Sequence, residues 1–322
     1  MTPATPWRLP RAGEYALVAA TVLEAAVFSA MAPGFFSVAN ALNIALSIAV
    51  TGILAVGMTA VILTGGIDLS VGSVVALAGV SGAMASVSAV GGLAPATVAL
   101  IAALLVGLAT GAVNGTLIAY LKVPAFVATL AMLTIARGLA FIVSSGRSIG
   151  NLPPTVGLLG RSILLGVPTP VFVMAAVMLL GGFVLTRTVF GRHIYAIGGN
   201  FEAAWLAGID TQRVIWLVYV LNGALVGIGG LTLASRLGAG VPNAGLQYEL
   251  DVIAAVVIGG TSLTGGRGTV TGTLWGTVFI GVLTNGLNLA NVDPYVQKIA
   301  LGVVIVVAVI GDQLNRRRGD TA

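Results

Sequence analysis

The residue types that enzymes most often use for catalysis are scarce in this chain of 322 residues, which has one His and no Cys. His193 stands beside Arg192 in a hydrophilic stretch, which argues against a buried Ser–His pair. A lone histidine without cysteines cannot build the usual transition-metal sites. Neither Lys122 nor Lys298 follows a glycine in the phosphate-binding P-loop pattern. We therefore expect neither catalytic residues nor a metal or cofactor site in this chain.

The stretch 198–209 is the most informative part of the sequence. Asn200 is a good N-cap, Glu202 suits a first helical turn, and Gly208 fits the position just after a helix. The predicted helix has about seven residues, which is too short to be stable alone. It must pack on its own bundle or dock on a partner, and its small alanine face, which includes Ala207, favours a partner. The candidate docking residues are Gly198, Gly199, Asn200, Glu202, Ala203, Ala204 and Gly208.

Polar side chains inside apolar segments form a second candidate set. Such residues are functional candidates by default, although Asn and Thr can also hold helices together. Asp68 or Ser70 could instead cap the helix that starts after Gly65 and Gly66. The scarcity of charge favours a neutral, polyhydroxylated solute over an ion. The candidate translocation residues are Asp68, Ser70, Asn114, Asn222, Asn285 and Asn288.

The composition indicates what must position these residues. Hydrophobic residues make up 57% of the chain and charged residues 8%, against about 25% charged in soluble domains. The mean hydropathy is +1.06, so lipid must cover part of the surface. A net charge of +5 on so few charged residues fits loop bias for membrane topology and not a nucleic-acid site.

Apolar runs bounded by Pro, Gly or charge predict about ten transmembrane helices. Most Lys and Arg fall on the side of the N-terminus, including the run at 316–318, so both ends are expected to be cytoplasmic. We expect one all-α transmembrane domain over 1–322, with cytoplasmic tails at 1–13 and 313–322 and a cytoplasmic loop at 188–212. The predicted spans are 14–32, 43–64, 71–90, 96–121, 124–144, 168–187, 213–236, 250–262, 270–290 and 295–312.

Two glycine-rich motifs indicate a weak internal repeat. They are Gly65-Gly66-Ile67-Asp68-Leu69-Ser70-Val71-Gly72 and Gly259-Gly260-Thr261-Ser262-Leu263-Thr264-Gly265-Gly266. Each follows an apolar run, although glycine-rich helices can resemble each other by chance. Repeats with interrupted helices are typical of transporters. The run at 250–262 is short, so 250–267 is either a complete span or a re-entrant or broken helix.

These two motifs, the stretch 198–209 and Ser235-Arg236-Leu237-Gly238 resemble signatures of the ribose-type permeases of bacterial sugar ABC importers. That family lies within the branched-chain amino acid/monosaccharide permease superfamily, and the resemblance extends from about residue 35 to 312. The family often has Glu or another residue in place of Phe201. The resemblance implies a multi-pass permease subunit of the bacterial inner membrane that imports a monosaccharide such as ribose or another pentose.

The resemblance also implies partners. A second permease, usually an identical copy, would complete the translocation path. An extracytoplasmic sugar-binding protein would deliver the solute, and 145–167 and 237–247 are its candidate contacts. A cytoplasmic ATP-binding-cassette ATPase would bind ATP and Mg and dock on 198–209.

Alternatives remain at this point. Related permeases carry nucleosides or the autoinducer-2 furanose, so the solute is open. An ion-coupled secondary transporter is permitted by the repeat and by Asp68 or Arg137, but it would work without partner chains.

Overall fold

A computed structural model of the chain describes residues 12–88 and 94–319. Its regular structure is helical except for one short hairpin, in agreement with the predicted all-α class. The predicted tail 1–13 lies almost wholly outside the described residues. The elements are α1 (Ala12–Met31), α2 (Val38–Leu63), α3 (Val71–Val87), α4 (Pro95–Gly115), the π-helical turn η1 (Thr116–Tyr120), α5 (Ala125–Val143), α6 (Pro154–Gly157), β1 (Ile163–Leu164), β2 (Val167–Pro168), α7 (Thr169–Arg187), α8 (Val189–Gly199), α9 (Phe201–Leu206), α10 (Thr211–Leu237), α11 (Tyr248–Ile258), α12 (Val270–Leu289) and α13 (Pro294–Gly319).

The helices follow the apolar runs of the sequence, and each predicted span overlaps one of them. Six are long and apolar enough to cross a membrane, namely α2, α4 with η1, α5, α7, α10 and α12. Shorter apolar stretches occur in α1, α3 and α13. The chain is therefore a multi-pass membrane protein. The total of ten spans and the orientation of the ends remain predictions.

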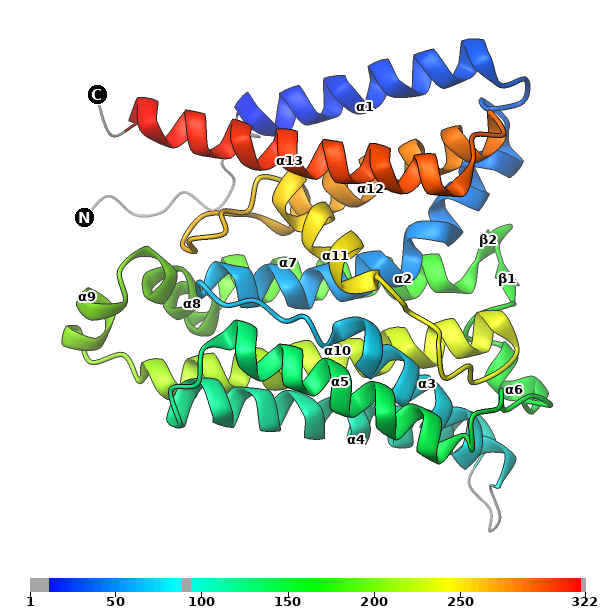
Figure 1. Cartoon of the computed structure of the whole chain (residues 1–322), viewed down its shortest axis with the longest axis horizontal. Helices are drawn as coiled ribbons and strands as arrows, with labels where there is room; N and C mark the ends of the chain where they lie inside the picture. The colour runs from blue at the N-terminus through cyan, green and yellow to red at the C-terminus, as the bar shows by residue number, and fades with distance from the viewer. Residues whose placement is uncertain (1–11, 89–93, 320–322) are drawn as a thin grey trace.

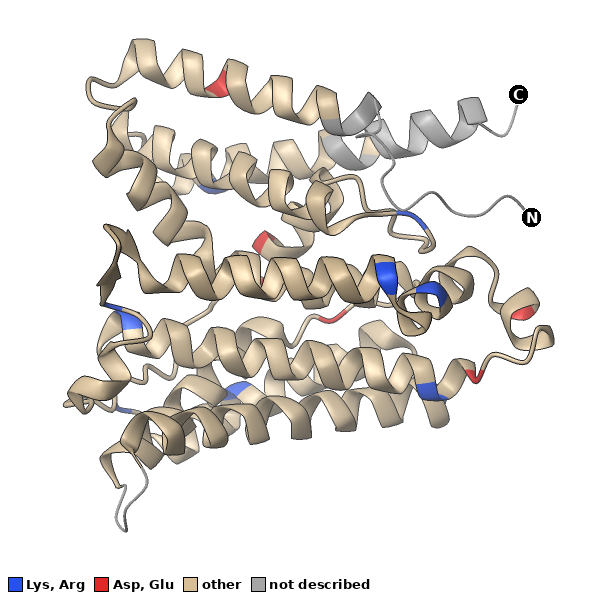
Figure 2. Ribbon diagram, turned by 180° about the vertical axis from the view of Figure 1, so that it is seen from behind, with Lys and Arg blue, Asp and Glu red and all other residues tan. Residues whose placement is uncertain are grey.

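Helices α2 and α10 form the centre of the bundle (Figure 1). In the apolar 18-residue stretch of α2, 78% is buried within the chain. The corresponding share in the outer helix α4 with η1 is 22%. The outer helices expose large apolar side chains such as Leu105, Ile142 and Leu179. Because few charged residues interrupt these outward faces (Figure 2), lipid is the natural solvent for them.

Glycines bring α4 and α10 into backbone contact. A Cβ atom at Gly107 would collide with the carbonyl oxygen of Gly223, and one at Gly223 would collide with that of Gly107. Gly111 and Gly227 meet the opposite backbone in the same way. The spacing of small residues four apart thus has the packing role expected of it in membrane helices.

A Gly107→Ala substitution tests this contact. We expect it to lower the free energy of unfolding by about 1–3 kcal/mol, because one helix must move away from the other. Thermal unfolding of the purified protein in detergent measures the change. Gly138→Ala in α5 is the matched control, since a Cβ there meets nothing within 4 Å, and an equal loss in both variants would contradict the explanation.

The two ends of the bundle differ. The start of α1, the end of α13 and the pair α8–α9 lie at one end, whereas α6 and the hairpin β1–β2 lie at the other (Figure 1). The hairpin is antiparallel, with Leu164 opposite Val167. The predicted topology places both chain ends on the same side as 188–212, and that sidedness stays a prediction.

Helix α11 is a broken element. It has 11 residues, which is about half the length needed to cross a bilayer, and the chain continues without helix until Val270. Its end repeats the end of α2: Gly66 N donates to Val61 O and Thr261 N donates to Val256 O. Gly65 and Gly260 are both left-handed, with φ of 79° and 85°, so the two helix ends have the same C-cap turn with Gly65 matched to Gly260.

Candidate coupling site and buried polar cluster

The stretch 198–209 forms the predicted capped helix. The side chain of Asn200 accepts a hydrogen bond from Ala203 N at 2.9 Å, and Gly208 has φ of 82° just after the helix. The observed helix α9 has six residues, close to the predicted length. Both caps were predicted, because they depend on residue types within one turn.

One of the three alanines predicted to meet a partner is buried, whereas Ala203 and Ala207 are exposed. Ala204 is 4% exposed and packs into the core of this chain, so it anchors the helix. Phe201, Trp205 and Leu206 are 47%, 62% and 72% exposed, and they form the apolar surface of the tip. The spacing of Phe201 and Trp205, four apart, was the available signal for this face.

The other docking candidates lie around that tip. Glu202 and Ala203 are exposed, as are Gly199 and Asn200. Gly198 instead faces inward, where a Cβ atom would collide with the Leu63 carbonyl oxygen. Of these candidates, Gly198 therefore packs against the bundle, whereas the others face solvent.

Four of the translocation candidates meet in one buried cluster. Asp68 accepts hydrogen bonds from Ser70 N at 2.9 Å and Ser70 Oγ at 2.6 Å. Asn222 Nδ2 donates to the other carboxylate oxygen at 2.8 Å, and Asn114 Nδ2 donates to Ser70 Oγ at 3.1 Å. All four side chains are at most 3% exposed. The cluster therefore joins the α2–α3 loop to α4 and α10.

Of the two side chains predicted to cap α3, Ser70 does not cap it, whereas Asp68 accepts from the backbone amide at its start. Ser70 is the N-cap residue, but its hydroxyl makes no cap hydrogen bond because it is bonded to Asp68 and Asn114. The carboxylate of Asp68 binds the Ser70 amide, which precedes the helix. The stronger interaction with a carboxylate replaces the cap.

A small cavity adjoins the cluster and is bordered by Asp68, Ser70, Thr110 and Asn114. The space inside it that water can occupy is about 10 Å³, which suits about one water molecule. Asn114 Oδ1 is buried and has no hydrogen-bond partner within the described residues. The cavity is too small for a sugar.

The remaining two candidates lie elsewhere. Asn285 and Asn40 exchange hydrogen bonds through their amides at 2.9 and 3.0 Å, which joins α12 to α2. Asn288 is exposed and accepts from Gln297 Nε2 at 2.9 Å. The six candidates are thus distributed over three separate places in the fold.

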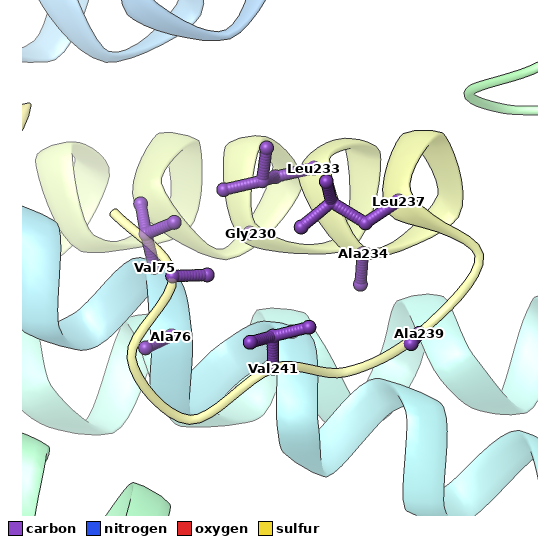
Figure 3. A pocket seen from close by; sticks show the side chains of 10 residues that line it. Val75, Ala76, Gly230, Leu233, Ala234, Leu237, Ala239 and Val241 are labelled. Atoms are coloured by element: carbon purple, nitrogen blue, oxygen red, sulfur yellow. The ribbon is translucent and has the colours of Figure 1, made fainter. Parts of the chain in front are cut away.

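The segment between α10 and α11 is held by a residue outside that set. Arg137 Nη1 donates to the carbonyl oxygens of Pro242 and Ala244 at 2.8 and 2.9 Å. Beneath this segment lies a shallow pocket with no room for an enclosed water molecule. Figure 3 shows that its side chains, including Val75, Leu233 and Val241, are apolar, so it offers a sugar no side-chain hydrogen bond.

Comparison with known proteins identifies the family. Residues 40–309 match the family described as branched-chain amino acid transport system / permease component. This chain belongs to that permease family. It is a multi-pass protein of the bacterial inner membrane, as expected from the sequence, and no solved structure matches it.

Relatives of the permease match it over nearly their whole length. The chain is 45% identical to the ribose import permease protein of Escherichia coli (strain K12), over 92% of each chain. It is 43% identical to the ribose import permease protein of Haemophilus influenzae, over 91% of each. It is 37% identical to the xylose transport system permease protein of Escherichia coli (strain K12), over 94% of this chain and 92% of that one.

Proposed function

We propose that this permease is the membrane subunit of an ATP-driven importer of a pentose, with ribose as the first candidate. Relatives named for ribose and xylose transport match nine-tenths of the chain. The structural observation that carries the proposal is α9, a capped helix at the end of the bundle with three large apolar side chains in solvent. Such a surface is costly to leave exposed and suits a protein partner.

The partner at α9 is a cytoplasmic ATP-binding-cassette ATPase, which binds ATP and Mg outside this chain. Phe201, Trp205 and Leu206 would enter a groove on the ATPase, with Glu202 and Ala203 at the rim. Closure of two ATPase domains would move both docking helices and switch the bundle between outward and inward access. The switch needs no catalytic group in the permease.

The sugar crosses between two copies of the chain. The buried cluster of Asp68, Ser70, Asn114 and Asn222 lies inside one chain and borders a cavity too small for a sugar. We therefore infer that these four residues hold the helices that shape the path. An extracytoplasmic sugar-binding protein would deliver the solute near β1–β2, at the end opposite α9 (Figure 1).

Reconstitution tests the function. Proteoliposomes that hold the permease, the ATPase and the binding protein of its own system are expected to accumulate labelled ribose, arabinose or xylose only with hydrolysable ATP. Uptake of leucine and of no pentose would indicate an amino acid transporter, as in the family's description. Uptake of only a nucleoside or the autoinducer-2 furanose would show that the solute is not a pentose. Uptake by the permease alone under an ion gradient would establish a secondary transporter instead.

A further inference from the structure

The loops that follow α2 and α11 lie against each other at the end of the bundle that carries α8 and α9. Gly266 N donates a hydrogen bond to Leu63 O at 2.9 Å. A Cβ atom at Gly265 would lie 2.9 Å from Gly65 N, which is closer than a Cβ atom normally lies to another heavy atom. The two segments therefore approach each other through backbone atoms at these points.

The end of α8 closes this contact from a third side. A Cβ atom at Gly198 would collide with Leu63 O and with Gly266 N, and one at Gly266 would lie 2.8 Å from Gly199 Cα. One turn earlier in α8, Tyr195 Oη donates to Gly268 O at 2.9 Å. Helix α8 thus contacts the end of α2 at Leu63 and the loop after α11 at Gly265, Gly266 and Gly268.

Helices α8 and α9 are joined stiffly enough to act together. Asn200 N donates to Ala196 O at 3.0 Å at the end of α8, while the Asn200 side chain caps α9. Ala204 of α9 packs in the same core cluster as Ile194, Ile197 and Leu63. Only Asn200 separates the two helices, and it is hydrogen-bonded to both.

The two loops lead into different parts of the permease. The loop after α2 runs through Asp68 to α3 and is tied there to α4 and α10. The loop after α11 runs to Thr269, whose side chain caps α12 by accepting from Gly272 N at 2.9 Å. The end of α8 thus contacts the segments that lead to α3 and to α12.

We propose that the end of α8, through Gly198 and Tyr195, is the contact by which movement of α9 reaches both members of the repeat, an inference that rests on the proposed function. Gly198 and Tyr195 are positioning residues, since neither meets the solute or ATP. Glycine is required at 198 because three backbone segments converge there.

The test uses the whole complex in proteoliposomes, with labelled ribose, arabinose and xylose as probes, and measures ATP hydrolysed per sugar imported. Gly198→Ala is expected to raise this ratio about fivefold or more, because coupling between sites is lost. Tyr195→Phe keeps the ring and removes one hydrogen bond, and is expected to raise the ratio about two- to fivefold. Gly182→Ala in α7 is the matched control, since a Cβ there meets nothing within 4 Å.

A loss of folded protein would lower hydrolysis and import together and leave the ratio unchanged, so the ratio separates coupling from stability. If Gly198→Ala does not assemble, Tyr195→Phe decides. A control-like ratio in Tyr195→Phe, and in Gly198→Ala where it assembles, overturns the inference and leaves the proposed function in place. A wild-type complex that hydrolyses ATP but imports no pentose overturns the proposed function itself.

Discussion

Trp205→Glu and Leu206→Glu variants are expected to lose the ATPase during purification and to lose import with it. Both side chains are more than 60% exposed at the tip of α9, so the permease itself should fold and elute as the wild type does. A buried aromatic or aliphatic anchor at an interface contributes about 2–4 kcal/mol, or roughly 30- to 1000-fold in affinity. Replacement by a carboxylate should remove that contribution and add the cost of a desolvated charge.

Co-purification of the ATPase with tagged permease measures this effect. Leu165→Glu is the matched control, because Leu165 is 90% exposed in the β1–β2 turn at the opposite end of the bundle. It should retain the ATPase fully. If the two α9 variants also retain it, the docking site is elsewhere.

Asp68→Ala is expected to give a large loss of stability. It leaves the Ser70 amide, the Ser70 hydroxyl and the Asn222 amide without their acceptor in a buried site, at about 1–3 kcal/mol for each donor left unpaired. The α2–α3 loop would keep only the hydrogen bond from Tyr219 Oη to Ile67 O as a side-chain connection to α10, so import should fall as well.

Thermal unfolding in detergent and sugar uptake measure the Asp68 variants. Asp68→Asn should be milder, since it keeps the shape and one acceptor while one amide nitrogen faces a donor. Asn288→Ala, which changes an exposed amide, should unfold near the wild-type midpoint. A wild-type midpoint for Asp68→Ala would show that the cluster does not hold these elements together.

Local features of this fold could be predicted from the sequence. The apolar runs located every helix except α6, α8 and α9, and the caps at Asn200 and Gly208 followed from residue type within one turn. The short run at 250–262 indicated a complete span or a re-entrant or broken helix, and α11 has 11 residues, too few for a complete span. These features depend on neighbours in the chain.

Features that depend on distant partners could not be predicted. Asn222 binds Asp68, which lies 154 positions away in the sequence. The residues around either one do not predict this pairing. The inward turn of Ala204 depends on how α9 lies on the core. The sequence comparison of the two glycine-rich motifs aligned Gly65 with Gly259. The hydrogen bonds and backbone angles instead match Gly65 to Gly260, a shift of one residue.

The amide pair of Asn40 and Asn285 has a consequence for how such chains diverge. Each amide uses both its oxygen and its nitrogen on the other, so a change at one position strands its counterpart among apolar helices. Related chains should therefore keep both asparagines or replace both in one evolutionary step. Anyone who redesigns this bundle should treat the two positions as a single choice.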